Sequence, residues 1–197
     1  MNQTKRKRRT QVLWRSFIPS LGMLLLAASQ AGAQGLLIDK SEIRFVSKQL
    51  GVNVEGKFRK WKANIVFLPK ELARSKAEFE IDLGSIDLAS NESETEIKSP
   101  QWFKTAKFPI ARFASTSIRH VGADKYEIAG KLTLKGVTRE VLVPIAVKKD
   151  TTGNSIAEGS FPVKRTDYKV GEGMWSDTEL VDNDVIVRIR MVLPPPA

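Results

Sequence analysis

Apolar and polar residues alternate with a period of two along most of the chain after residue 34. In the segment 77–83, for example, Ala77, Phe79 and Ile81 alternate with charged residues. Successive side chains of a β-strand point to opposite faces, so this pattern buries one set of side chains and leaves the other in water. A helix would need apolar residues three and four positions apart. The chain is therefore predicted to be all-β.

The alternating segments are short and follow one another at regular spacing. Turn-forming residues separate them, as at Lys135-Gly136. This spacing is typical of an antiparallel sandwich or barrel. No internal repeat and no linker interrupts the pattern, so the chain after residue 33 is expected to form one domain. The expected strands lie within residues 43–45, 52–58, 61–67, 77–83, 126–134, 141–147, 157–163 and 185–191.

One polar segment, Ser90–Ser99, lacks the alternation and is rich in glutamate. Asn91 can cap a helix there, glutamates are favourable near a helix N-terminus, and Pro100 stops helix growth. We therefore expect one short helix near residues 91–99. Of its glutamates only Glu92 and Glu96 share a helix face, and their place at the helix start accounts for them, so no metal site is predicted.

The first 33 residues have the pattern of a cleaved secretory signal peptide. A basic cluster at Lys5–Arg9 precedes an apolar run at Phe17–Ala28, and Ala31-Gly32-Ala33 offers a small-residue cleavage site. The alternative is a membrane anchor, but a run of 12 residues is shorter than the roughly 20 that span a bilayer. Residues 1–33 are thus predicted to be removed, residues 34–197 to form the mature domain, and the location to be periplasmic.

Cleavage changes what the composition implies. Six lysines and arginines and none of the acidic residues lie in the first 33 positions, so the formal net charge falls from +10 to +4. The high charge of the precursor is therefore no argument for a nucleic-acid partner. The chain has no cysteine, which excludes disulfides, zinc–thiolate sites and a cysteine nucleophile.

The inward-facing residues leave the state of the barrel interior open. They combine large rings with small residues such as Gly56, Ala63 and Gly159. Small residues opposite large ones indicate either interdigitated packing or space left empty, and a barrel of about eight strands accommodates both. Because protein interiors are normally close-packed, the residues by themselves favour a filled core.

Catalytic groups are sparse in this sequence. His120 is the single histidine, lies beside Arg119 near the end of an expected strand, and would have to serve any Ser-His-Asp triad. A structural role is the simpler interpretation of a histidine in that place, so we predict no catalytic residue and no cofactor. The polar run Arg165–Tyr168 leaves a strand and is expected to form an ion-paired corner or the mouth of a cavity.

Several ordered motifs between residues 38 and 192 resemble the YceI-like family. The run Gly130–Val141, GKLTLKGVTREV, is similar to that family's G-x-L-T-x-x-G-V-T-x-x-V hairpin. Leu50-Gly51 followed by Val54–Phe58, the segment Trp102–Pro109, and Phe161–Tyr168 fit the family in the same order.

The resemblance implies an extended, lipocalin-like antiparallel β-barrel whose interior binds a polyisoprenoid or another long-chain lipid without catalysing a reaction. The alternative that it implies is an interaction module for a membrane electron-transfer system, with a b-type cytochrome as partner. A homodimer is a further possibility of such barrels. The expected lining residues are Phe45, Val54, Phe58, Phe67, Phe79, Ile81, Trp102, Phe103, Phe108, Phe113, Leu132, Leu134 and Phe161.

The sequence departs from the family where the polar end of a ligand is expected. Many members carry histidine where this chain has Lys48-Gln49, and arginine, aspartate and histidine where it has Asn91–Glu96. The head group is therefore open between a phosphate, a quinone and a fatty amide. An acidic helix would repel a phosphate unless Lys98, Lys104 or Arg165 faced it.

Overall fold

The structure, a computed structural model, describes residues 35–195; the signal peptide predicted over residues 1–33 lies outside them. Ten strands and one α-helix form the described part, and no helix in it is long and apolar enough to cross a bilayer. The elements are β1 (Glu42–Gln49), β2 (Val52–Phe58), β3 (Trp61–Val66), β4 (Lys76–Asp82), β5 (Ile86–Asp87), α1 (Asn91–Glu96), β6 (Ile110–Gly122), β7 (Lys125–Leu134), β8 (Val137–Lys149), β9 (Ser155–Lys164) and β10 (Asp184–Leu193), with 3-10 helices η1 (Ile38–Lys40), η2 (Leu72–Arg74), η3 (Leu83–Ser85), η4 (Arg165–Tyr168) and η5 (Gly173–Ser176).

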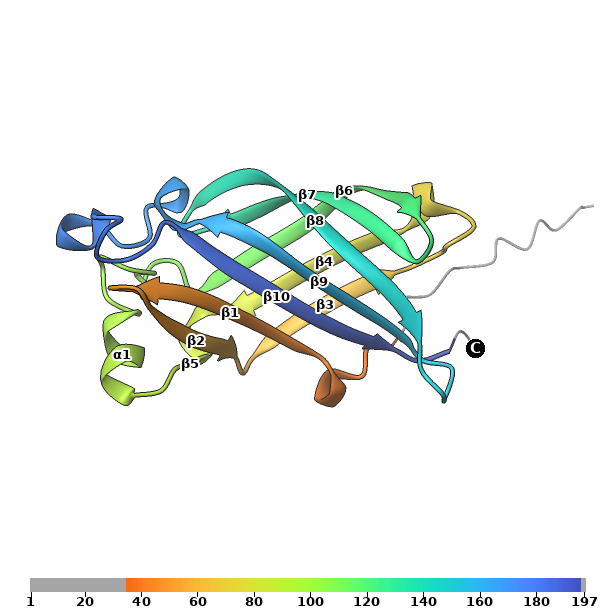
Figure 1. The fold of residues 1–197 in the computed structure, drawn as a ribbon, viewed down its shortest axis with the longest axis horizontal. Helices are drawn as coiled ribbons and strands as arrows, with labels where there is room; N and C mark the ends of the chain where they lie inside the picture. Colours follow the sequence, from red (N-terminus) through yellow and green to blue (C-terminus); the bar gives the residue numbers. More distant parts are fainter. Residues whose placement is uncertain (1–34, 196–197) are drawn as a thin grey trace, which may run out of the picture. The chain divides into compact units, whose positions relative to one another are not determined.

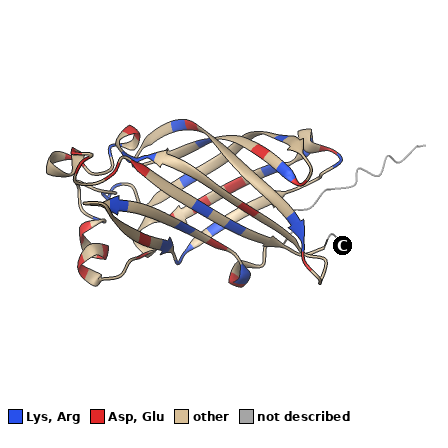
Figure 2. Cartoon of the chain, in the orientation of Figure 1, with Lys and Arg blue, Asp and Glu red and all other residues tan. Residues whose placement is uncertain are grey.

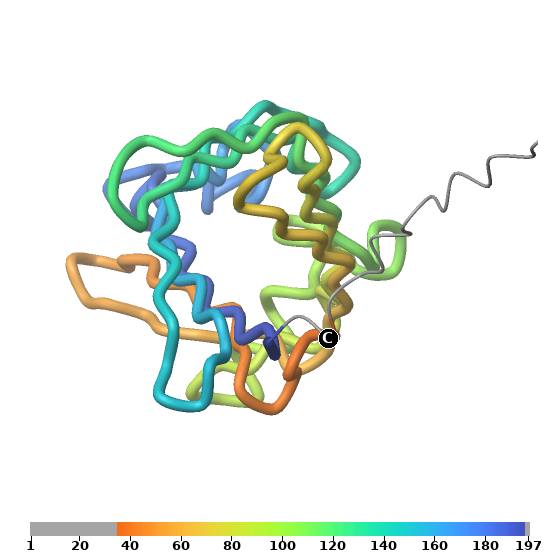
Figure 3. Tube along the Cα trace, turned by 90° about the vertical axis from the view of Figure 1, so that its right-hand side faces the viewer, coloured from red at the N-terminus to blue at the C-terminus, as the bar shows by residue number. Residues whose placement is uncertain are grey.

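All ten strands belong to one antiparallel sheet. Its order is β3-β4-β6-β7-β8-β9-β10-β1-β2-β5, so most neighbouring strands also follow one another in the chain. The sheet curls until its strands surround a common axis (Figures 1 and 3). Its two end strands, β3 and β5, share no ladder in the described chain, but β2 continues directly into β3. Backbone hydrogen bonds from the Arg59 N–H to the Ser85 carbonyl and from the Asp82 N–H to the Lys60 carbonyl, both 3.0 Å, connect the β2–β5 and β3–β4 ladders, so backbone hydrogen bonding continues around the barrel. The predicted all-β, lipocalin-like barrel is confirmed.

Charged residues of both signs are spread along the strands (Figure 2), and most of their side chains are exposed on the outer face of the sheet. Several of them pair across neighbouring strands: Arg112 Nε lies 3.0 Å from Glu80 Oε1, and Arg190 Nε lies 3.2 Å from Glu158 Oε1. Each such exposed pair contributes little stability, on the order of 0–1 kcal/mol. Burial of the opposite, apolar face is therefore the main source of stability for the sheet.

The short helix predicted near residues 91–99 is α1, but its capping residue is one position earlier than expected. Ser90 has extended backbone dihedrals, and its Oγ accepts a hydrogen bond from the Ser93 backbone N–H at 3.1 Å. Asn91 is already helical. The prediction of Asn91 as cap was wrong because serine and asparagine cap equally well and only the backbone angles decide between them.

Strand β6 (Ile110–Gly122) is not among the strands predicted from the alternation, because its own alternation is interrupted. The register between β6 and β7 shifts between Ser115 and Ser117, which is a β-bulge. Buried side chains therefore occupy odd positions before the bulge, as at Ala111, and even positions after it, as at Ile118. One extra residue reverses the face on which every later side chain lies.

The predicted turn at Lys135-Gly136 joins β7 to β8 as a two-residue hairpin loop. Both residues have positive φ angles, 50° at Lys135 and 77° at Gly136, as a type I′ turn requires. Phe108 packs against this turn. A Cβ atom added at Gly136 would lie 2.7 Å from Phe108 Cε1, so the position requires glycine both for its backbone angle and for space.

Replacing Gly136 with alanine should destabilise the fold by about 2 kcal/mol, from left-handed backbone strain and overpacking against Phe108. Differential scanning calorimetry should then show a melting temperature lower by roughly 4–8 °C. Gly35→Ala is the matched control, since nothing lies within 4 Å of that position. Equal melting temperatures for the two variants would contradict this assignment.

Candidate functional site

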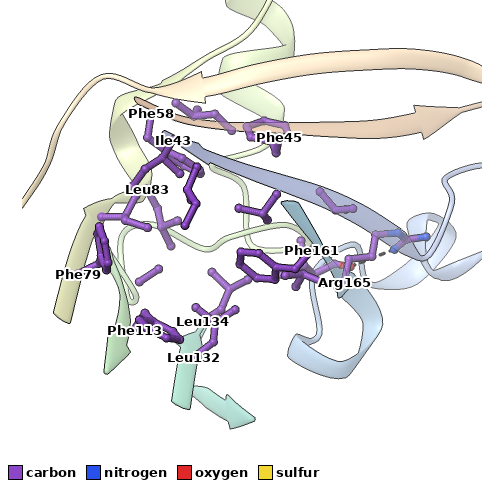
Figure 4. Close-up of a pocket in the computed structure, with 18 of the residues that line it drawn as sticks. Ile43, Phe45, Phe58, Phe79, Leu83, Phe113, Leu132, Leu134, Phe161 and Arg165 are labelled. Atoms are coloured by element: carbon purple, nitrogen blue, oxygen red, sulfur yellow. Dashed lines mark hydrogen bonds between the residues drawn. The ribbon is translucent and has the colours of Figure 1, made fainter. Parts of the chain in front are cut away.

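The inner faces of the strands enclose a cavity of about 1120 Å³. Its wall is made of aliphatic and aromatic side chains from all ten strands, part of which Figure 4 shows pointing toward a common space. A cavity of this size exceeds the roughly 300–1,000 Å³ typical of small-molecule pockets. The barrel is therefore hollow. The prediction of a filled core, which rested on the residues alone, is wrong.

Pairs of aromatic rings form two parts of the wall. The ring centroids of Phe45 and Phe58 lie 5.7 Å apart on β1 and β2, and those of Phe79 and Phe113 lie 6.2 Å apart on β4 and β6. Tilted contacts at these distances are favourable for aromatic rings. The rings therefore pack sideways against neighbours in the wall rather than across the interior.

Two glycines allow the rings to lie close to the wall. Gly56 is the cross-strand partner of Phe45, and a Cβ atom there would come within 2.7 Å of Phe45 Cε1. At Gly130 a Cβ atom would come within 2.5 Å of Phe113 Cε2. Each ring thus occupies the space above a missing side chain. Gly56 and Gly130 therefore make room for rings beside the wall, and a small residue at these two positions does not indicate a filled interior.

Of the thirteen residues predicted to line the interior, twelve lie on the cavity wall: Phe45, Val54, Phe58, Phe67, Phe79, Ile81, Trp102, Phe103, Phe113, Leu132, Leu134 and Phe161. Phe108 does not. Its ring covers the turn at Gly136, with Lys107 Nζ 5.4 Å from the ring centroid. It was misplaced because its segment, between α1 and β6, has no strand periodicity. That the twelve bind a ligand stays a prediction.

The wall also contains residues that were not selected from the sequence. Val185, Val187 and Ile189 of β10 belong to an alternating run and could have been chosen by the same rule. Met174 and Trp175 could not, because they lie on η5, in an irregular segment without periodicity.

The polar part of the lining is concentrated at one end of the cavity. There α1, the β1–β2 turn and η5 lie together (Figure 1). We call this end the mouth, and define it by seven lining residues that are exposed to solvent. The mouth residues are Gln49, Glu92, Ser93, Thr95, Glu96, Gln101 and Met174. The one other exposed lining residue among the described residues is Lys76, at the start of β4.

Arg165 is buried beside the mouth, with only 2% of its surface exposed. Its guanidinium donates to five backbone carbonyls and to no carboxylate of the described chain. The acceptors are the carbonyl oxygens of Val170, Gly171, Asp177, Val181 and Asp182, at 2.6–3.3 Å. Burial lowers the pKa of Arg165. The predicted ion-paired corner is thus wrong: this arginine holds a loop together through its carbonyl groups, and it lines the cavity.

Lys135 provides a second buried cation near the mouth. It is 7% exposed, and its Nζ donates to Glu172 Oε2 at 2.7 Å and to the Lys169 carbonyl at 2.6 Å. A longer bond of 3.3 Å reaches the carbonyl of Gln101. The hydrogen bond from Lys135 lowers the pKa of Glu172. The β7–β8 turn is therefore joined to both irregular segments that border the mouth.

Trp102 is held in the lining by packing alone. Its ring lies 5.5 Å from that of Trp175, centroid to centroid, and the Arg165 guanidinium carbon lies 6.0 Å from its centroid. Its buried Nε1–H has no acceptor in the described part of the chain. An unmade bond of this kind costs on the order of 1–3 kcal/mol.

The structure does not bring the other sequence candidates together as a reactive site. His120 is exposed, and its Nε2 lies 2.6 Å from the carbonyl oxygen of Ala123. Its ring packs 5.0 Å from Tyr126, outside the cavity lining. Within residues 35–195 no group of three or more acidic or histidine side chains is placed to hold a metal ion.

A model of the YceI-like domain matches residues 37–193, which is most of the chain and all ten strands. The chain belongs to the YceI-like family. This confirms the resemblance drawn from the sequence motifs.

Several curated relatives of this YceI-like protein are named UPF0312 proteins. One from Azotobacter vinelandii is 31% identical over 173 residues, covering 83% of this chain and 90% of the relative. Another, from Photorhabdus laumondii, is 32% identical over 157 residues, covering 75% and 81%.

Solved structures share the fold. BcnA of Burkholderia cenocepacia matches this YceI-like protein with a TM-score of 0.77 and 34% identity, covering 80% of this chain and 99% of BcnA. A polyisoprenoid-binding domain from Saccharophagus degradans matches with a TM-score of 0.66 and 19% identity, covering 83% and 99%. At that lower identity the likeness shows the fold alone.

Arg165→Met should destabilise the protein by about 3–5 kcal/mol, because five carbonyls lose their donors at once. Hydrogen exchange should show the loss of protection concentrated in residues 165–183. Arg188→Met is the control: Arg188 is an exposed arginine of β10 with no side-chain hydrogen bond in residues 35–195. Similar stability of the two variants would contradict the role assigned to Arg165.

Glu172 should give the fold a pH dependence in the acid range. Since its pKa in the folded state lies below the ordinary 4.5, its stabilisation is present above that value and lost as the pH falls through the folded-state pKa. Thermal melts should show Glu172→Gln less stable than the wild type at neutral pH, with the difference closing as the pH drops from about 5 to 3. Glu179→Gln, an exposed acid of the same segment, should show no such difference. A stability difference between Glu172→Gln and the wild type that stayed constant over this pH range would refute the role assigned to Glu172.

Proposed function

We propose that this protein binds a polyisoprenoid or another long-chain apolar lipid in its barrel interior, as a periplasmic carrier or reservoir without chemistry of its own. The observation that carries the proposal is a cavity of about 1120 Å³ whose body is apolar and whose exposed polar lining gathers at one mouth. The signal-peptide pattern in residues 1–33 supports the periplasmic setting.

The cavity volume sets the size of the ligand. At about 30 Å³ for each non-hydrogen atom, the volume that a water molecule occupies in the liquid, the cavity holds roughly 35–40 such atoms. A long chain of that size buries its surface at about 25 cal/mol per Å² of apolar area. A wall with few polar groups in its body suits this mode of binding, since affinity then depends mainly on burial rather than on directional bonds.

A solved structure with the same fold supports the proposal of a lipid ligand. The neighbour from Saccharophagus degradans is described as polyisoprenoid-binding, and it has the same barrel. A cytochrome partner and a homodimer stay predictions.

Native mass spectrometry of the protein purified from periplasm without detergent tests the proposal. We expect a co-purifying apolar molecule that organic extraction releases, with a mass fitting roughly 35–40 non-hydrogen atoms. A ligand-free mass, together with no uptake when isoprenoids are offered, would contradict the proposal.

Leu132→Trp should block uptake without unfolding the barrel. Leu132 lies on the cavity wall, so a larger side chain has empty space to enter. We expect isoprenoid affinity to fall by about tenfold or more while the melting temperature changes by only a few degrees. The control is Lys131→Trp, on the opposite face of the same strand and exposed. A strongly destabilised Leu132→Trp would instead indicate that this part of the interior is filled.

A further inference from the structure

The polar end of a bound chain has one preferred place in this cavity. Seven of the eight exposed lining residues form the mouth, whereas the described lining outside it is apolar except for the Ser47 hydroxyl, the Lys76 amine at the start of β4 and the fully hydrogen-bonded Arg165. Burying an unpaired polar group in such a body would cost several kcal/mol. The head group therefore belongs at the mouth, and the side chains there decide which head groups are accepted.

The charged groups of the mouth are carboxylates. Glu92 and Glu96 lie one helical turn apart on α1, both line the cavity, and neither has an ion-pair partner within residues 35–195. Glu94, between them, is directed elsewhere: its Oε1 accepts from the Leu88 N–H and lies 3.4 Å from Arg59. The helix thus turns its two unpaired acids toward the ligand space.

Among residues 35–195, no cationic side chain that lines the cavity at or beside the mouth is free to offset these acids. Lys98 and Lys104, which could have received a phosphate, do not line the cavity. Arg165 lines it, but all five of its N–H donors are used by backbone carbonyls. A phosphate at the mouth would therefore meet two carboxylates and no available cationic donor.

Neutral hydrogen-bonding groups complete the mouth. The side-chain amides of Gln49 and Gln101 are exposed, line the cavity and form no hydrogen bond with the rest of the described chain. An amide both donates and accepts, so it can pair with a hydroxyl, a carbonyl or another amide. We propose that the mouth selects lipids with a neutral hydroxyl, carbonyl or amide head group over lipids with an anionic one. This inference rests on the proposed lipid-binding function.

The test compares two ligands with the same tail, geranylgeraniol and geranylgeranyl monophosphate, by titration at low salt. We expect the wild type to bind the alcohol about tenfold more tightly, since the phosphate carries −1.5 to −2 charges near two carboxylates. Raising the salt concentration should narrow the difference.

Glu92→Gln/Glu96→Gln should tighten phosphate binding by about threefold or more and leave alcohol binding within about twofold. Glu55→Gln/Glu140→Gln is the matched control, because it removes the same charge from exposed strand positions outside the cavity lining and should change neither affinity. Phosphate binding as tight as alcohol binding in the wild type, or no change in the first double variant, would overturn the inference. If the wild type bound neither ligand, the proposed function itself would fail.

The amides are tested with a ligand that has no head group. Gln49→Leu/Gln101→Leu should weaken geranylgeraniol binding by about threefold or more and leave binding of the hydrocarbon squalene unchanged. Equal effects on both ligands would exclude the amides as head-group partners.

Discussion

The open interior depends on aromatic rings that lie against the wall of the barrel. A phenylalanine that projects straight inward from a curled sheet would meet its counterpart from the far side. Here Phe45 and Phe113 are instead accommodated over Gly56 and Gly130, where no side chain competes for the space. Phe58 and Phe79 pack against these two in tilted contacts along the wall. Close packing is therefore satisfied within the wall, and the axis of the barrel is left free.

Much of the wall could be predicted from the sequence because alternation is a local property. Val52–Phe58 alternates without interruption and forms β2 over the same residues. β6 could not be assigned in full, since its bulge reverses the parity halfway along. The hollow interior could not be derived from alternation at all. Whether a ring crosses the axis or lies on the wall depends on a glycine in the neighbouring strand, which is a relation between distant positions.

The mouth was harder to predict from the sequence, because it too depends on contacts between positions far apart in the chain. The sequence suggested an ion pair for Arg165, yet its partners are backbone carbonyl groups. Every residue has such a group, so the sequence does not show which ones an arginine will bind. Met174 and Trp175 lie on a short 3-10 helix with no periodic signal. The strand pattern thus defined the part of the cavity that would hold an apolar chain, and the tertiary structure was needed for the part that would meet its polar end.

The two buried cations have a consequence for the rate of ligand exchange. The segments bordering the mouth have little regular structure, but Arg165 and Lys135 bind them through eight hydrogen bonds. A pre-organised rim of this kind loses little conformational entropy when a ligand arrives. The residence time of a lipid would then be governed by drawing its tail back into water, so that longer chains would dissociate more slowly at a nearly constant rate of capture.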